Sequence, residues 1–155
     1  MQALKHTPAP KGLTIYRLTD PDCVTLRMYD VSVPAGFPSP AADYREEEID
    51  FNHLLRPRPS STFVIKVDGN SMIDAHIPDQ SWLVVDRSIK PANGNIVVAV
   101  VNSEFTVKRF VKNSSGIRLM PANPKYNPIV ITEDMDFIVW GTVTKIIIDP
   151  LKSSV

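Results

Sequence analysis

A single serine stands in a tight turn near the middle of the chain, where it could act as a nucleophile. An apolar run, Phe63–Ile65, precedes the turn Gly69-Asn70-Ser71-Met72, and apolar residues resume directly after the serine. Glycine permits a tight bend, and a strand before the bend would fix the direction of the Ser71 hydroxyl. A serine in a Gly-Asn turn more commonly bonds to nearby backbone. The turn alone therefore leaves both roles open.

A lysine on an apolar strand supplies a candidate base for that serine. Alternation along Glu104–Val111 places Thr106, Lys108 and Phe110 on one face of the predicted strand. Lys108 is either an exposed edge residue that guards against aggregation or a buried lysine kept neutral. A lysine base working near neutral pH needs its pKa lowered from about 10.4 to about 7–8, a shift of roughly 4 kcal/mol. A packed apolar pocket could supply that shift, whereas an exposed edge could not.

A serine and a neutral lysine form a known variant of the activated-nucleophile arrangement. Lys108 would take the Ser71 proton, and Ser71 Oγ would attack a peptide carbonyl. The backbone N–H groups of Ser71 and Met72 are the expected oxyanion donors, because they lie at the turn itself. The three histidines suggest no Ser-His-Asp triad, and no second His or Cys lies at metal-binding spacing from His53. We therefore expect neither a metal nor a cofactor.

An extended segment upstream offers a candidate substrate within the same chain. Three prolines keep the segment around Ala35-Gly36 extended and exclude it from a helix. Ala35 and Gly36 are its smallest adjacent residues, and such a dipeptide can lie in a protease cleft as an added strand. Taken in isolation, the segment is more typical of a plain linker between an N-terminal arm and the body. The residues alone leave both interpretations open.

The rest of the chain predicts a mainly β body with one short helix. A capping-box spacing between Asp43 and Glu46, an acidic first turn and Pro57 after the end predict a helix over residues 43–55. Apolar runs separated by turn residues and prolines predict short strands in a strongly bent sheet. We expect these strands at residues 62–67, 82–86, 95–101, 104–111, 117–120, 129–131 and 137–148, with short edge strands at 13–16 and 24–26.

The composition is that of an ordinary soluble globular protein. The 155 residues are 43% hydrophobic, and 17 basic residues balance 17 acidic ones, so no basic field would drive DNA binding. Prolines in residues 1–34 leave no room for the recognition helix of a helix-turn-helix domain. The lone cysteine, Cys23, cannot form an intramolecular disulfide, and no segment resembles a membrane span or a signal peptide. We expect a cytoplasmic protein with neither membrane attachment nor direct sequence-specific DNA binding.

Three features now coincide: a Gly-x-Ser-Met turn, a Thr-Val-Lys-Arg strand and an Ala-Gly bond in an extended segment. Together they resemble the LexA/UmuD family of self-cleaving Ser-Lys peptidases, and most closely its UmuD-type members. The similarity includes Ala35–Tyr44, Ile49-Asp50, Asn52 with Leu54-Leu55, Gly69–Asp74, Val85-Asp86, Glu104–Lys108 and Asn123-Pro124 with Tyr126. It implies a LexA/signal-peptidase-like bent β-sheet body over residues 36–155, preceded by an extended arm, residues 1–35, that self-cleavage removes.

The resemblance also implies a function. Ser71 would be the nucleophile and Lys108 the general base, and Ala35-Gly36 would be the scissile bond of this same protein. A RecA filament on single-stranded DNA would stimulate the cut. The shortened product would then join a UmuC-like, Y-family subunit as accessory component of an error-prone translesion polymerase in the SOS response to DNA damage. Family members are homodimers, so an arm would reach its own active site or its partner's.

Three other interpretations use the same residues. A LexA-like transcriptional repressor or regulator shares the catalytic body but needs a DNA-binding domain before the bond, and the proline-broken residues 1–34 are short for one. A signal-peptidase-like processing enzyme needs a membrane anchor or an exposed apolar face. A β-rich binding module would regulate a polymerase without any catalysis.

Overall fold

A computed structural model of the chain shows two compact units, residues 1–19 with 58–155 and residues 20–57. We call the first of these the strand body. The structure describes residues 5–7, 14–17, 25–29, 46–55 and 57–151. The proposed cleavage residues Ala35 and Gly36, with Cys23 and Asp43, lie outside the described residues. The predicted boundary after residue 35 is the point at which self-cleavage would divide the chain. Because residues 35 and 36 are not described, this boundary stays a prediction.

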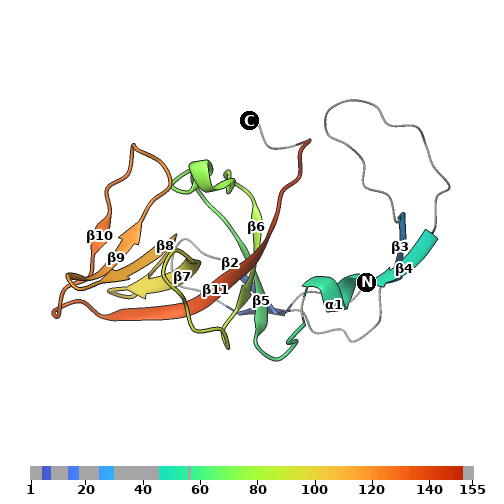
Figure 1. The fold of residues 1–155 in the computed structure, drawn as a ribbon, viewed down its shortest axis with the longest axis horizontal. Coiled ribbons are helices and arrows are strands. Elements are labelled where there is room, and N and C mark those ends of the chain that lie inside the picture. The colour runs from blue at the N-terminus through green and yellow to red at the C-terminus, as the bar shows by residue number, and fades with distance from the viewer. Residues whose placement is uncertain (1–4, 8–13, 18–24, 30–45, 56, 152–155) are drawn as a thin grey trace. The chain divides into compact units, whose positions relative to one another are not determined.

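The strand body is built on one antiparallel sheet with the spatial order β1-β2-β5-β6-β11-β7-β8-β9-β10 (Figure 1). The strands are β1 Lys5–Thr7, β2 Thr14–Arg17, β5 Thr62–Lys66, β6 Trp82–Asp86, β7 Ile96–Val101, β8 Glu104–Asn113, β9 Gly116–Met120, β10 Ile129–Val130 and β11 Phe137–Ile147. The mainly β fold class is confirmed. From residue 62 onward, each expected strand is present with its ends displaced by no more than two residues.

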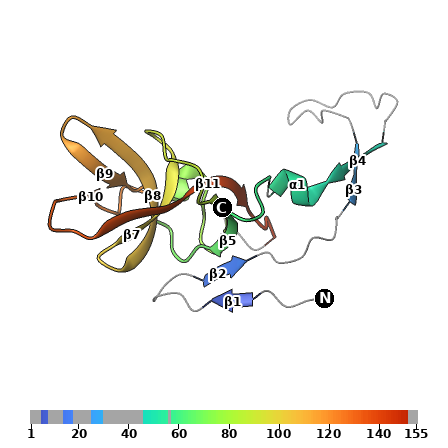
Figure 2. The ribbon, with the colours of Figure 1, turned by 90° about the horizontal axis from the view of Figure 1, so that it is seen from below.

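Two strands from the N-terminal arm extend this sheet. β1 pairs with β2, and β2 pairs with β5 so that Ile15 stands opposite Ile65 (Figure 2). The sequence leaves open whether the arm packs on its own body or on a partner. The structure shows residues 14–17 paired with β5 of the chain's own body, and residues 5–7 paired with residues 14–17.

The long strand β11 joins the two halves of the sheet. Its first part pairs with β7, where Phe137 stands opposite Val101, and its later part pairs with β6, where Ile147 stands opposite Trp82. The register shifts twice along the strand, between residues 139 and 141 and between residues 143 and 145. Such irregularities bend a strand and increase its twist. They give the strongly bent sheet that the sequence predicts.

The largest hydrophobic cluster lies directly beside the residues that could do chemistry. Met72, the residue after Ser71, is 1% exposed, and Val107, the residue before Lys108, is 9% exposed. Both belong to one cluster with residues of β5, β6 and β7. Because packed side chains hold their backbone in place, this cluster fixes the serine turn relative to strand β8.

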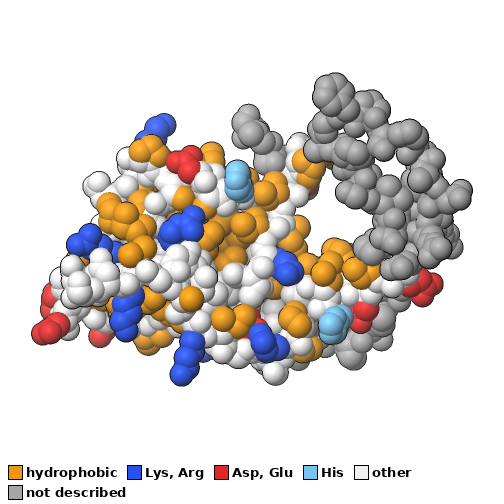
Figure 3. Space-filling model, viewed as in Figure 1, with side chains coloured by type: hydrophobic (Ala, Val, Ile, Leu, Met, Phe, Trp, Pro, Cys, Tyr) orange, Lys and Arg blue, Asp and Glu red, His pale blue; other side chains and the backbone are white. Residues whose placement is uncertain are grey.

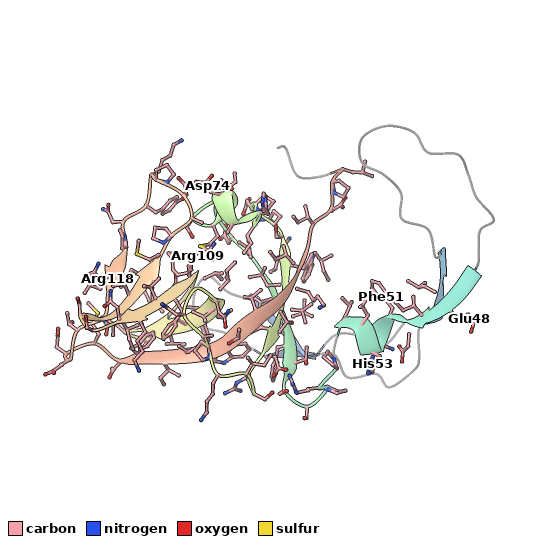
Figure 4. The ribbon with its side chains drawn as sticks, viewed as in Figure 1. Glu48, Phe51, His53, Asp74, Arg109 and Arg118 are labelled. Atoms are coloured by element: carbon pink, nitrogen blue, oxygen red, sulfur yellow. The ribbon has the colours of Figure 1, made fainter. Side chains whose placement is uncertain are left out.

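The predicted helix over residues 43–55 is wrong over residues 46–50 and confirmed over residues 51–55. Glu46–Asp50 form strand β4, which pairs with β3 (Thr25–Tyr29), and only Phe51–Leu55 form the helix α1. Glu46 belongs to the β ladder, where it stands opposite Tyr29, so it does not lie in the first turn of a helix. Figure 4 shows Glu48 on β4 and Phe51 on α1.

The helix starts at a different cap from the one predicted. The Asp50 carboxylate accepts hydrogen bonds from the backbone N–H groups of Asn52 at 2.9 Å and His53 at 3.2 Å. These are the bonds of an N-cap residue, so α1 begins directly after Asp50. His53 is exposed.

The described surface mixes both signs of charge. In Figure 3, basic and acidic side chains of the strand body are interspersed with hydrophobic ones and form no continuous basic field on that face. Within the part of the chain that the structure describes, no helix is long and apolar enough to cross a membrane.

We predict that Gly141→Ala lowers the free energy of unfolding by about 1–3 kcal/mol. A Cβ atom at residue 141 would lie 2.6 Å from Cγ1 of Val85, which is fully buried and cannot shift without disturbing the core. Chemical denaturation measures the loss. In the double variant with Val85→Ala, the total cost should be smaller than the sum of the two single costs. Additive costs would contradict a clash at this position.

Candidate active site

The serine turn and strand β8 bring Ser71 and Lys108 into contact. Lys108 Nζ lies 2.8 Å from Ser71 Oγ. On β8, Lys108 stands opposite Val97 of β7, the pairing with β9 begins at the next residue, Arg109, and only 7% of Lys108 is exposed. The alternative of an exposed edge lysine is therefore wrong.

Three oxygen atoms surround the Lys108 amine. Besides Ser71 Oγ, they are Thr106 Oγ1 at 3.0 Å and the Val107 carbonyl at 2.9 Å. A neutral amine can donate to Thr106 and Val107 while its lone pair accepts the Ser71 proton, and an ammonium can donate to all three oxygens. The geometry thus satisfies both protonation states. A proton can pass from Ser71 to Lys108 without rearrangement of these neighbours.

Burial favours the neutral state of this lysine. Desolvation of the Lys108 amine lowers its pKa below the ordinary value of 10.5, because the apolar surroundings disfavour the charged form. Among the described residues, no carboxylate forms an ion pair with Lys108 that would raise the pKa again. A lysine with a lowered pKa is the form that can act as a general base near neutral pH.

A groove of about 190 Å³ opens beside the two side chains. Phe105, Val107 and Tyr126 contribute apolar surface to it, and Tyr126 is 44% exposed. Ser71 and Lys108 also line this groove. An open groove of mixed polarity can take an extended peptide, which places a backbone carbonyl within reach of the serine.

The turn that carries Ser71 depends on a glycine and a carboxylate. Gly69 has a φ of +98°, which residues with side chains rarely adopt. Its N–H donates to Asp79 Oδ1 at 2.7 Å, and the Asp79 N–H donates to Asn70 Oδ1 at 3.2 Å. The bond from Gly69 is the main cause that lowers the pKa of the Asp79 carboxyl, so this residue holds the turn as a carboxylate.

The two expected oxyanion donors have different surroundings. Among the residues that the structure describes, none accepts a hydrogen bond from the Ser71 N–H. Met72 forms an isolated antiparallel bridge with Ile77, whose N–H donates to the Met72 carbonyl at 3.3 Å. Residues bonded in this way turn their backbones toward each other, which directs the Met72 N–H toward Ile77. The Ser71 N–H is therefore better supported as an oxyanion donor than the Met72 N–H. Both assignments stay predictions.

Sequence reasoning missed the polar partners that hold this arrangement. Thr106 precedes Lys108 by two residues on a strand, so both side chains lie on the same face. That spacing could have identified Thr106 as a partner of the Lys108 amine. Asn123 Nδ2 donates to the Asn70 carbonyl at 2.8 Å, although 53 residues separate the two positions. No local pattern indicates a contact over that distance.

The histidines whose side chains the structure describes do not line the groove. His76 is exposed, with a φ of 58°, at the end of a single 3₁₀ turn, Ile73–Ala75, that follows the serine. Figure 4 shows Asp74 on this turn. Within the described ranges, no group of three or more His, Cys, Asp or Glu residues could hold a metal ion. His53 is exposed on α1, in the other compact unit.

Comparison with known proteins places this site in a peptidase family. The chain belongs to the Peptidase S24-like family, which matches residues 27–144. It is 42% identical over 123 residues to protein SamA of Salmonella typhimurium, covering 79% of this chain and 85% of that protein. It is 35% identical over 149 residues to protein ImpA of Escherichia coli, covering 95% of both. These matches confirm the resemblance to the LexA/UmuD family.

A LexA repressor is also among the similar proteins. The chain is 40% identical over 106 residues to the LexA repressor of Desulfatibacillum aliphaticivorans. That match covers 68% of this chain but 51% of the repressor. The similarity therefore supports the shared peptidase body and does not extend to the repressor as a whole.

We predict that Lys108→Met raises the free energy of unfolding near neutral pH when both proteins carry Ser71→Ala to prevent cleavage. Methionine keeps the apolar stem and removes the charge whose desolvation lowers the Lys108 pKa. Between that lowered pKa and 10.5, the unfolded lysine holds a proton that the folded lysine has lost, so the lysine protein gains stability as pH rises. The advantage of methionine should shrink over this interval, as measured by denaturation at several pH values. A constant difference would contradict a buried, titrating lysine.

Proposed function

We propose that this protein is a self-cleaving serine peptidase in which Ser71 is the nucleophile and Lys108 its general base. The observation that carries the proposal is the 2.8 Å contact between Ser71 Oγ and the Nζ of a buried lysine. Membership in the Peptidase S24-like family supports the peptidase chemistry. The resemblance to UmuD-type members supports Ala35-Gly36 as the bond that is cut.

The reaction follows from the geometry of the dyad. Neutral Lys108 takes the Ser71 proton as Oγ attacks the carbonyl carbon of Ala35, and the oxyanion is stabilised by backbone N–H groups at residues 71 and 72. The lysine then returns the proton to the departing Gly36 nitrogen, which leaves Ala35 esterified to Ser71. A water molecule, deprotonated by Lys108, hydrolyses the ester and frees the serine.

The biological role we propose is that of an SOS mutagenesis protein. A RecA filament on single-stranded DNA stimulates the cut, and residues 36–155 then serve a UmuC-like, Y-family polymerase subunit as its accessory protein in translesion synthesis. The protein acts as a cytoplasmic homodimer. The match to ImpA over 95% of both chains supports this role more directly than the partial match to a LexA repressor supports a regulatory one.

The first test is the conversion of the purified chain without an activator. The wild-type chain should yield a product that begins at Gly36, whereas folded Ser71→Ala and Lys108→Ala should yield none above background. Because a deprotonated lysine is the base, the wild-type rate should rise between about pH 7 and about pH 10. Mass spectrometry identifies the product, and gel densitometry gives the rate.

Two results of this test would contradict the proposal. Conversion of Ser71→Ala or Lys108→Ala to the same product would exclude the dyad. A flat rate over the alkaline range would exclude lysine as the base. Circular dichroism of each variant confirms that the β fold is retained.

A second test addresses the bond itself. Gly36→Glu places a bulky, charged side chain at the cleavage point and should block the cut while leaving the unfolding midpoint unchanged, since a peptide cleft that takes a small dipeptide excludes the glutamate. The matched control is Ser39→Glu, which adds the same side chain three residues after Gly36 and should be cut more readily. Normal processing of Gly36→Glu would mean that another bond is cut.

A further inference from the structure

The segment between β9 and β10 holds two carbonyl groups beside the nucleophile. Asn123 Nδ2 donates to the Asn70 carbonyl at 2.8 Å, and the Ala122 N–H donates to the Ser71 carbonyl at 2.9 Å. In return, the Asp74 N–H donates to the Ala122 carbonyl at 2.8 Å. The serine turn is therefore tied to residues 122–123 on both sides of Ser71.

The bond from Asn123 controls the direction of the Ser71 N–H. The Asn70 carbonyl and the Ser71 N–H belong to one planar, trans peptide unit, so the two groups point in opposite directions. Asn70 and Ser71 both line the groove, whereas Asn123 is not among its lining residues. Holding the carbonyl against Asn123 thus leaves the Ser71 N–H directed away from Asn123. None of the described residues accepts a bond from this N–H.

We propose that Asn123 is a positioning residue of the oxyanion site, whose side-chain amide orients the Asn70–Ser71 peptide so that the Ser71 N–H meets the oxyanion. The inference rests on the proposed self-cleavage and adds how its oxyanion donor is held. Donors fixed in advance avoid reorganisation during the reaction, and losing one such donor slows catalysis about 10²–10³-fold. Donation to the Asn70 carbonyl also polarises the peptide and strengthens the Ser71 N–H as a donor.

Asn123 makes a second hydrogen bond, which stabilises its own loop and does not involve the serine turn. Its Oδ1 accepts the Lys125 N–H at 2.9 Å and so closes a local turn. Asn123→Asp keeps this oxygen and loses the amide donor, whereas Asn123→Ala loses both. Asn113→Asp is a matched control, because Asn113 Oδ1 accepts the Ser115 N–H at 2.9 Å in the same kind of turn and does not line the groove.

The experiment measures unactivated self-cleavage of the full chain from about pH 7 to about pH 10 and compares plateau rates and pH midpoints. Asn123→Asp and Asn123→Ala should both lower the plateau rate about 10- to 100-fold, since the Ser71 N–H is misdirected without being removed. Asn113→Asp should match the wild type. The midpoint of Asn123→Ala should stay at the wild-type value, because Lys108 keeps its three oxygen neighbours.

The outcomes show whether the inference alone fails or the proposed function fails with it. A wild-type plateau rate in Asn123→Asp would overturn the inference even with a slow Asn123→Ala, because the local turn would then explain the effect. A shifted midpoint in Asn123→Ala would overturn it as well, since the base would be disturbed. A folded wild-type chain that does not cleave itself would overturn the proposed function, and the inference with it.

A second measurement does not depend on cleavage. In Ser71→Ala protein the backbone amide of residue 71 remains, and its ¹H–¹⁵N resonance reports on the hydrogen bond to the carbonyl of the same peptide unit. Adding Asn123→Asp should shift this resonance, whereas adding Asn113→Asp should leave it in place. An unchanged resonance in the Asn123→Asp protein would contradict the inference.

Discussion

The burial of one amine is the constraint on which the rest of this site depends. Lys108 is 7% exposed, with oxygen atoms of Ser71, Thr106 and Val107 around its nitrogen. Desolvation lowers its pKa, and the same three oxygens suit the neutral and the charged form. The packing that buries Lys108 is therefore part of the chemistry. An exposed lysine would stay solvated and charged.

The serine side of the site is held by hydrogen bonds from both side chains and backbone. Gly69 provides the left-handed bend, and Asp79, Asn123 and the backbone of Ala122 bind polar groups of residues 69–71. Met72 then anchors the turn in the core. This arrangement presents Ser71 to Lys108 before any substrate arrives. If the chain cuts itself, control of the reaction is therefore more readily placed at the docking of the segment around Ala35 than at assembly of the dyad, as a shift between undocked and docked populations.

Much of the fold was predictable because its signals are local. Apolar runs bounded by turn residues located strands such as Trp82–Asp86 at both ends. The helix prediction failed because a capping-box spacing at Asp43 and Glu46 says nothing about pairing with β3, which takes Glu46–Asp50 into a strand. Whether Lys108 is buried also depends on residues packed around it from other parts of the chain, which the alternation along one strand does not reveal. The contact between Asn123 and Asn70 is equally non-local, so only the structure shows it.

The most direct measurement is the intact mass of the chain after incubation with ATP and a RecA filament on single-stranded DNA. Self-cleavage by the Ser71–Lys108 dyad predicts two products, residues 1–35 and 36–155, whose masses sum to that of the chain plus one water molecule. Ser71→Ala should keep its full mass under the same conditions. Self-cleavage by this dyad would be contradicted by a cut at another bond, by an unchanged wild-type mass, or by equal cutting of Ser71→Ala.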